Sequence, residues 1–451
     1  MSTPGRPKCE FRSAQHGGCL MSEHRIRSVH GRRVWDSRGR PTVEAEVVLQ
    51  DGAMGRAIVP AGASRGTREA LELRDGTPAF GGLDVRRAVE HVNGEIAHAL
   101  AGAPAGDQAA LDRRLVELDG TPAKTRLGAN ATLAVSMAAA HAVAAARHVP
   151  LYESIGGPSA TLLPMPQIQI FGGGAHAGRR VDIQDFMVVC PGARHFGQAL
   201  EWTAEVYRCA GRLMEARGVT HGVADEGGWW PAFATNEQAL ETLVQAIERA
   251  RFVPGEQVAI ALDVAASEFG GDGRYTLGLD ALALDSDGLI ELLLRWIDRY
   301  PIVSIEDPLA EDDLDGFARF TRAAGHRLQI VGDDLLVSHA PLVREAAERG
   351  AANTVLLKPN QRGTLTETLE AWEAARAVGY AGIVSARSGE TEDTTIVHLA
   401  LGWSAGQLKV GSFSRSERMA KWNEALRIEE RLGARARFAG AAAFGRNPPR
   451  G

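Results

Sequence analysis

Cysteine is scarce in this sequence, and no spacing gives it a metal-binding or redox role. The four cysteines are Cys9, Cys19, Cys190 and Cys209, and no two of them form a CxxC pair. A chain of 451 residues with so few thiols does not depend on a disulfide framework. We therefore expect reduced thiols and a cytoplasmic protein.

Long apolar runs and positive net charge are also missing. No run of 18 apolar residues occurs, and the first 20 residues lack the apolar core of a secretory signal. The formal net charge is −6, whereas nucleic-acid-binding proteins present basic surfaces. We expect no membrane span and no nucleic-acid partner. Any phosphate bound here belongs to a small anionic molecule, met by a local cluster of cations.

Residues 1–21 are rich in Gly, Pro, Arg and Ser, a composition typical of disorder. The patterned sequence begins just after Met21, which is therefore an alternative start. We expect residues 1–21 to be a dispensable disordered extension. A chain that starts at Met21 and fails to fold, or loses activity, would contradict this.

The rest of the chain divides into two patterns. Alternate residues from Val43 to Leu49 are apolar, and Asp51-Gly52 follows as a hairpin turn, which predicts an antiparallel sheet. From Asp84 to Pro150 the composition favours helices. We expect a smaller α+β domain, a linker, a catalytic barrel domain and a C-terminal tail. Their predicted bounds are 22–160, 156–166, 161–433 and 434–451.

Short apolar runs in the second half of the chain end in polar residues. The gaps between these ends from Glu306 to Lys409 are 27, 25, 29 and 22 residues, about the length of one strand, one helix and two loops. This pattern predicts an α/β fold, a (β/α)8 TIM-type barrel, whose carboxyl strand ends meet at one cleft. The converging residues are Asp263, Glu306, Asp333, Lys358, Arg387 with Ser388, and Lys409.

Three carboxylates on neighbouring strand ends repel one another unless a cation lies between them. Oxygen ligands favour a hard cation such as Mg²⁺. A lysine near such cations can lose its proton and act as a base, so metal and lysine together suit proton abstraction next to a carboxylate. Glu226 adds an acid in a Gly-flanked loop. One such residue alone is as readily a structural ion pair, but five at barrel spacing favour a site.

Long, specific motifs occur between about Arg25 and Leu432. They are Trp35–Glu44, Gly62–Ser64, Glu69–Gly76, Asp225–Gly228, Ser267–Phe269, Tyr300–Pro308, Val331–Leu335, Arg387–Asp393, Gly406–Lys409 and Arg427–Glu430. Through these motifs the sequence resembles the enolase family. The resemblance implies an α+β domain on a barrel, a homodimer or higher homo-oligomer, and reversible dehydration of 2-phosphoglycerate to phosphoenolpyruvate with a lysine base and Mg²⁺.

The resemblance also implies a role for each site residue. Two Mg²⁺ ions are expected per site, one on the carboxylates and one on the mobile loop together with the substrate phosphate. The metal ligands would be Asp263, Glu306 and Asp333 for the first ion and Ser64 for the second. The proton would be taken by Lys358, and the leaving hydroxyl would be protonated by Glu226. The substrate-binding residues would be His176, Gln184, Asp185, Arg387, Ser388 and Lys409.

The sequence departs from enolases inside the site. Enolases carry a histidine where this chain has Ala386, and a glutamate where it has Asp185, one methylene shorter. Losing a donor near developing charge can cost about 10²–10³ in rate. Further differences are Arg40, Ala61, Arg65, Gly172, Arg179, Arg180 and Arg362. Single arginines on a surface are usually solvated and uninformative.

Three interpretations follow. The first is a slow but ordinary enolase. The second is a relative of the enolase-like carboxyphosphonoenolpyruvate synthases of phosphonate antibiotic pathways. There, space at Ala386, with Arg65 and Arg179, would admit a cytidylyl-phosphonoformate co-substrate. The third is a non-catalytic binding protein on an enolase scaffold, which the retained carboxylate trio argues against.

Overall fold

The N-terminal domain is built on a three-stranded antiparallel sheet. The computed structural model describes residues 24–444, so the predictions for residues 1–21 lie outside the described residues. Strand β2 (Pro41–Leu49) buries alternate side chains from Val43 to Leu49, as the sequence pattern predicts. It pairs with β1 (Ile26–Trp35) and, through the Asp51-Gly52 turn, with β3 (Met54–Ile58).

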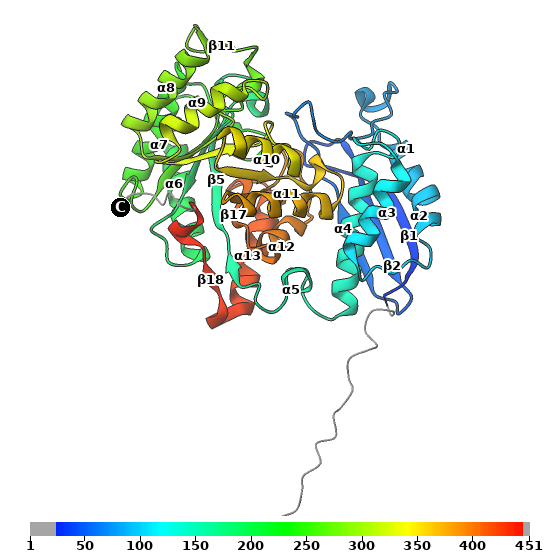
Figure 1. Ribbon diagram of the computed structural model, residues 1–451. Coiled ribbons are helices and arrows are strands. Elements are labelled where there is room, and N and C mark those ends of the chain that lie inside the picture. The colour runs from blue at the N-terminus through cyan, green and yellow to red at the C-terminus, as the bar shows by residue number, and fades with distance from the viewer. Residues whose placement is uncertain (1–23, 445–451) are drawn as a thin grey trace, which may run out of the picture.

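Helices cover one face of this sheet. The longest, α4 (Ala129–Ala146), packs on β2 and β3 and separates them from the barrel (Figure 1). A Cβ at Gly55 of β3 would lie 2.1 Å from backbone atoms of α4, so only glycine permits this approach. The other helices here are α1 (Arg86–His91), α2 (Ala97–Leu100), which a π-helical turn (Val92–Ile96) joins to α1, α3 (Gln108–Asp119) and α5 (Leu151–Gly156).

By length and composition, α4 is the one described helix apolar enough to cross a membrane, and 83% of it is buried within the protein. Its alanines face the sheet on one side and the barrel on the other, which is how the core helix of a globular domain is placed.

Eight strands close into a barrel, which confirms the predicted fold class. β17 pairs with both β16 and β5, and this second pairing closes the sheet. The apolar runs predicted as strands form β9, β13, β14, β15, β16 and β17. The barrel strands are β5 (Met165–Gly172), β6 (Asp185–Val189), β9 (Ala259–Asp263), β13 (Ile302–Glu306), β14 (Gln329–Gly332), β15 (Thr354–Leu357), β16 (Ala381–Ser385) and β17 (Gly406–Ser412).

One strand departs from the regular alternation that the sequence predicts. β6 runs antiparallel to both of its neighbours, β5 and β9, and the connection from β5 to β6 contains a short 3-10 helix (Gly174–Ala177) but no α-helix. The first residue of β6, Asp185, therefore lies at the barrel end where β5 and β9 finish. In the register, Asp185 is paired with Asp263, the last residue of β9.

Helices surround the barrel, and short strands fill some of the loops. The long ones are α6 (Phe196–Arg217), α7 (Asn236–Arg249), α8 (Ser286–Arg299), α9 (Leu314–Ala324), α10 (Ala340–Arg349), α11 (Leu365–Ala377), α12 (Thr395–Gly402) and α13 (Ser416–Leu432). The short strands in these loops are β7 (Thr220–Val223), β8 (Trp229–Pro231), β10 (Gly270–Gly271), β11 (Arg274–Leu277) and β12 (Leu282–Asp285).

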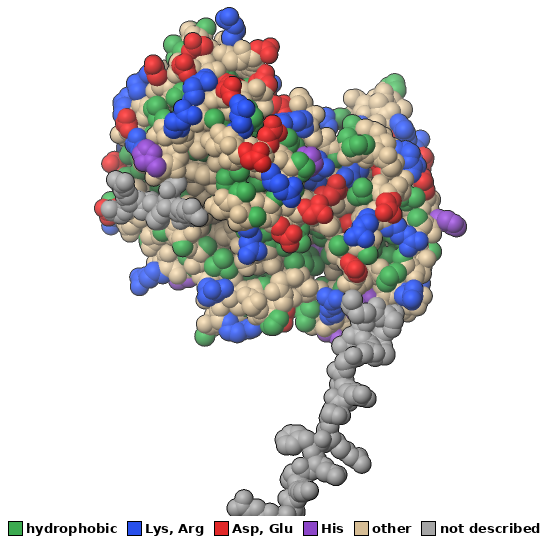
Figure 2. All heavy atoms as spheres, in the orientation of Figure 1, with side chains coloured by type: hydrophobic (Ala, Val, Ile, Leu, Met, Phe, Trp, Pro, Cys, Tyr) green, Lys and Arg blue, Asp and Glu red, His purple; other side chains and the backbone are tan. Residues whose placement is uncertain are grey.

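The chain after α13 returns to the barrel. β18 (Arg437–Phe438) pairs with β4 (Leu162–Leu163), which lies in the predicted linker. Ala443 and Phe444 pack with Met165 at the end of the barrel opposite to Asp263. Residues 434–444 of the assigned tail therefore close that end, and residues 445–451 lie outside the described residues. On the face in Figure 2, acidic and basic side chains are interspersed.

Candidate active site

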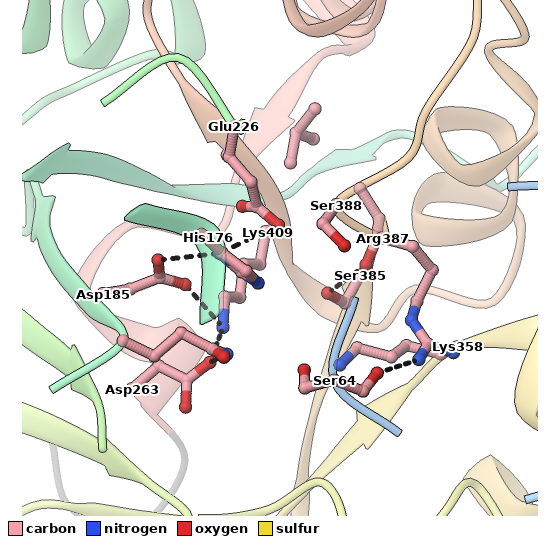
Figure 3. A pocket seen from close by; sticks show the side chains of 14 residues that line it. Ser64, His176, Asp185, Glu226, Asp263, Lys358, Ser385, Arg387, Ser388 and Lys409 are labelled. Atoms are coloured by element: carbon pink, nitrogen blue, oxygen red, sulfur yellow. Dashed lines mark hydrogen bonds and ion pairs between the residues drawn. The ribbon is translucent and has the colours of Figure 1, made fainter. Parts of the chain in front are cut away.

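Ten of the twelve predicted site residues line one pocket at the barrel mouth, which holds about 310 Å³ of empty space. The other two, Glu306 and Asp333, contact its lysines. Figure 3 shows Asp263 and Lys409 on one side of the pocket, facing Ser64 and Lys358 across it. The lining residues are Ser64, His176, Gln184, Asp185, Glu226, Asp263, Lys358, Ser385, Ala386, Arg387, Ser388, Lys409, Val410 and Gly411.

The Lys409 ammonium lies among three carboxylates. Its Nζ is 2.6 Å from Asp263, 2.8 Å from Glu306 and 3.3 Å from Asp185. Burial lowers the pKa of Lys409, but these carboxylates outweigh it and hold the pKa well above its usual value. Burial and the neighbouring Asp263 charge raise the pKa of Glu306 well above its usual value. One buried cation thus contacts carboxylates from three strands and offsets part of their charge.

Lys358 makes the second lysine–carboxylate pair, with Asp333. Burial lowers the pKa of Lys358, yet the Asp333 charge leaves it raised. Asp333 also accepts a hydrogen bond of 2.8 Å from Gln361 Nε2. Ser338 Oγ in turn accepts from the Lys358 backbone N–H and donates to Gln361. The proposed base is therefore held by its backbone as well as by its ammonium group.

His176 lies between two acids. Its Nδ1 is 3.7 Å from Asp185 Oδ1 and 3.7 Å from Glu226 Oε1. Burial lowers the pKa of His176, but Glu226 and Asp185 together leave it raised. Burial raises the pKa of Asp185, and Lys409 and His176 more than offset this, so that Asp185 remains ionised. This corner of the pocket can hold and donate protons.

A loop from the N-terminal domain closes over the phosphate-binding candidates. Arg387 donates to the backbone carbonyl of Ser64 at 2.8 Å and pairs with Glu69. Ser388 Oγ accepts from the Ala63 backbone N–H at 2.6 Å. A Cβ at Gly62 would lie 2.1 Å from the Arg387 guanidinium, so glycine is needed there. The predicted mobile loop thus lies against the predicted phosphate site.

The predicted metal ligands are divided between the lysines. Asp263 and Glu306 share Lys409, and Asp333 pairs with Lys358. Among the described residues, two sets have three potential ligand atoms within 4.8 Å of one another, and the predicted trio of Asp263, Glu306 and Asp333 is not one of them. Glu306 Oε1 is buried and makes no hydrogen bond. Clustered carboxylates with an unpartnered buried oxygen fit a hard cation. The two other sets are His176 with Asp185 and Glu226, and Asp307 with Asp333 and Asp334.

Arg65 and Arg179, two of the arginines that differ from enolases, form ion pairs outside the pocket. Arg65 pairs with Glu72, and Arg179 pairs with Glu268 at 2.6 Å. Neither lines the pocket, so neither presents a free cation to a bound anion there. Ala386 does line it and is 7% exposed. Of the positions at which this sequence differs from enolases, Ala386 and Asp185 are the ones whose side chains line the pocket.

Sequence reasoning missed two side chains that hold site residues in place. Gln169 donates to Asp185, and Arg38 donates to Ser388 at 3.3 Å. The signal for Gln169 was present, because Gln167 and Gln169 interrupt an otherwise apolar strand at alternate positions. A polar residue inside a buried strand must find a partner.

A capping α+β domain over a closed barrel, with acids and lysines at the barrel mouth, defines a two-domain barrel enzyme. Comparison with protein families gives the narrower assignment. The model described as "Enolase, N-terminal domain" matches residues 26–155, and that described as "Enolase, C-terminal TIM barrel domain" matches residues 160–447. The chain belongs to the enolase family, and this family membership implies a lyase-type enzyme.

Proposed function

We propose that this protein takes the carbon-bound proton next to the carboxylate of 2-phosphoglycerate, or of a close analogue, and releases an enolpyruvate such as phosphoenolpyruvate. The observation that carries this proposal is the pocket itself. Lys358, Glu226 and Lys409 line it together with the anion-binding pair Arg387 and Ser388. A base, an acid and two kinds of anion-binding group are therefore within reach of one small substrate.

Each residue then has one task. Lys409 neutralises the substrate carboxylate, and Arg387 with Ser388 holds the phosphate. Lys358 Nζ accepts the C2 proton in its neutral form, so its ammonium group must first lose the proton that it shares with Asp333 in the ion pair. The C3–oxygen bond breaks with its electron pair on the leaving hydroxyl, which Glu226 protonates to water. His176, beside Glu226, keeps this corner of the pocket polar.

We propose that Asp263, Glu306 and Asp333 hold one Mg²⁺ and that Ser64 contributes to a second. Bound there, Mg²⁺ supplies positive charge beside the substrate carboxylate as proton loss adds negative charge to it. The residues fit this role because three carboxylates face one region that two ammonium groups now neutralise.

The test is an assay with Mg²⁺ and 2-phosphoglycerate that follows phosphoenolpyruvate. Turnover of about 1–10³ per second, the usual enzyme range, supports the proposal. No turnover, together with no Mg²⁺ binding by calorimetry, would refute it and favour a binding protein on the same scaffold.

Ala386 supports a second candidate, a carboxyphosphonoenolpyruvate synthase. A methyl side chain lines the pocket where enolases place an imidazole. The room this leaves would take part of a cytidylyl-phosphonoformate co-substrate. No product from 2-phosphoglycerate alone, but product once that co-substrate is added, would establish this candidate over the first.

Two variants separate room from hydrogen bonding at this position. Ala386→His adds bulk and a donor, so it should raise turnover of 2-phosphoglycerate and exclude the larger co-substrate. Ala386→Phe adds bulk alone, so it should exclude the co-substrate without raising that turnover. Equal effects of the two variants would show that the imidazole hydrogen bond is irrelevant.

We also propose that the enzyme works in the cytoplasm as a homodimer or a higher homo-oligomer. Sedimentation equilibrium tests the assembly directly. A mass near 48.1 kDa at micromolar concentration would contradict it, because this is the mass of one chain.

A further inference from the structure

One side-chain amide joins Asp185 to the short loop that carries Glu226. Gln169, in β5, is fully buried, and its Nε2 donates to Asp185 Oδ1. Its Oε1 accepts a hydrogen bond of 2.8 Å from the Gly228 backbone N–H. Both ends of the amide are therefore used, and no proposed chemical step uses Gln169 itself.

The two partners of Gln169 stand on either side of His176. Asp185 is 3.7 Å from the His176 ring nitrogen and 3.3 Å from Lys409 Nζ. Gly228 closes the short loop that carries Glu226, whose Oε1 is also 3.7 Å from that ring nitrogen. By holding both partners, one amide fixes how far Asp185 and the Glu226 loop lie apart.

The Gln169 amide is tightly packed on all the sides that the neighbouring glycines define. A Cβ at Gly228 would lie 2.3 Å from Gln169 Oε1, so any larger residue would displace the amide. A Cβ at Gly172 would lie 3.3 Å from Nε2 and 2.6 Å from the Ala224 side chain. The Gln169 backbone carbonyl accepts a 2.5 Å hydrogen bond from Ser412 Oγ, which fixes the base of the side chain.

We propose that Gln169 is a positioning residue for Asp185 and the Glu226 loop, and that its length is matched to the short Asp185 side chain. The inference rests on the proposed function, in which Glu226 is the acid. A glutamate at position 185 would push its carboxylate into the Gln169 amide. An asparagine at position 169 would leave a gap. Making both changes exchanges one methylene between facing side chains and restores contact.

The test is a double-mutant cycle with Gln169→Asn, Asp185→Glu and the pair, assayed with Mg²⁺ on 2-phosphoglycerate, with and without cytidylyl-phosphonoformate. Each single change should lower kcat by about 10–100-fold with little effect on KM, because the acid is misplaced and the anion contacts are intact. The double variant should return to within about 3-fold of the natural enzyme, which a loss of stability alone would not produce.

Gln167 provides the matched control. It is buried on the same strand, two residues away, and its amide donates to Gln407 at 2.9 Å without lining the pocket. Gln167→Asn should cost similar stability and leave kcat nearly unchanged. A Gln169→Asn enzyme as active as the control would overturn the positioning role, and a double variant no better than the worse single one would overturn the length match.

Crystal structures of the variants separate this inference from the proposed function. If the natural enzyme converts neither substrate, the proposed function fails. The structures then decide the inference on their own. A Glu226 loop displaced in Gln169→Asn and restored in the double variant supports it, and an unmoved loop overturns it.

Discussion

Replacing Lys409 by methionine tests whether the pocket is built to hold a divalent cation. The substitution keeps the length and apolar stem but removes the charge that neutralises Asp263, Glu306 and Asp185. These carboxylates are buried and lie on adjacent strands. Removing one partner of a buried ion pair costs about 3–5 kcal/mol. Without divalent cations, we expect a loss of that size in the free energy of unfolding.

Mg²⁺ should restore much of this loss, because it supplies the missing positive charge. Above its Kd, each tenfold rise in Mg²⁺ concentration adds about 1.4 kcal/mol to the stability of the folded form. We therefore expect a larger Mg²⁺-induced rise in Tm for Lys409→Met than for the natural protein. The assay is thermal or urea unfolding with EDTA and then across a Mg²⁺ series, and it needs no substrate.

A second buried lysine controls for charge removal as such. Lys124 is 1% exposed and pairs with Glu367, where the N-terminal domain meets the barrel. Lys124→Met should also destabilise the protein, but Mg²⁺ should not restore it. An equal Mg²⁺ response in the two variants, or no loss of stability in Lys409→Met, would refute the reasoning.

The stability deficit of Lys409→Met should also depend on pH. Burial and Asp263 already raise the pKa of Glu306, and loss of Lys409 removes the charge that opposes this rise. Protonation of the carboxylates relieves their repulsion. The stability deficit of Lys409→Met should therefore be larger at pH 8 than at pH 5.

Three further predictions concern single titratable side chains, two in the pocket and one outside it. Lys358→Ala should lower kcat by about 10²–10⁴-fold and abolish exchange of the C2 hydrogen of 2-phosphoglycerate in deuterated solvent, followed by NMR; retained exchange would exclude Lys358 as the base. Glu226→Gln should retain that exchange but lose elimination by a similar factor, and loss of both would show that Glu226 acts before the proton leaves. Burial and nearby His141 lower the pKa of His398 to about 4, against about 6.5 when unfolded, so its contribution to stability is complete above about pH 6.5 and falls by about 3 kcal/mol towards pH 4. Denaturant titrations of His398→Gln should lack this acid-side loss, and an unchanged pH profile would contradict it.

The pattern of the sequence determined the barrel and most of its mouth. Apolar runs that end at Asp263, Glu306 and Lys358 encode strands buried on both faces, and the spacing between them encodes the intervening helices. Local sequence is enough to predict these strands, because a strand buried on both faces consists of consecutive apolar residues. The family resemblance added His176 and Gln184, which lie in the pocket but outside any strand-end pattern.

Strand direction was decided by the tertiary structure. The alternation of strand and helix predicts eight parallel strands, but β6 follows β5 as an antiparallel partner. This reversal puts the first residue of β6, Asp185, at the barrel mouth beside Asp263. A short apolar run reads the same in either direction, so its sequence does not reveal which end faces the site.

The sequence by itself determined which charged groups meet at one end of the barrel. Only the tertiary structure decided how those charges are shared: Lys409 serves three carboxylates, Lys358 serves Asp333, and the arginine at position 179 is held by Glu268 outside the pocket. It also decided that the Gln169 amide joins Asp185 to the backbone of Gly228 in the loop that carries Glu226. The physical reason is that burial leaves a local periodic trace along the chain, whereas ion pairs and hydrogen bonds join residues from separate elements and depend on distances that only packing sets.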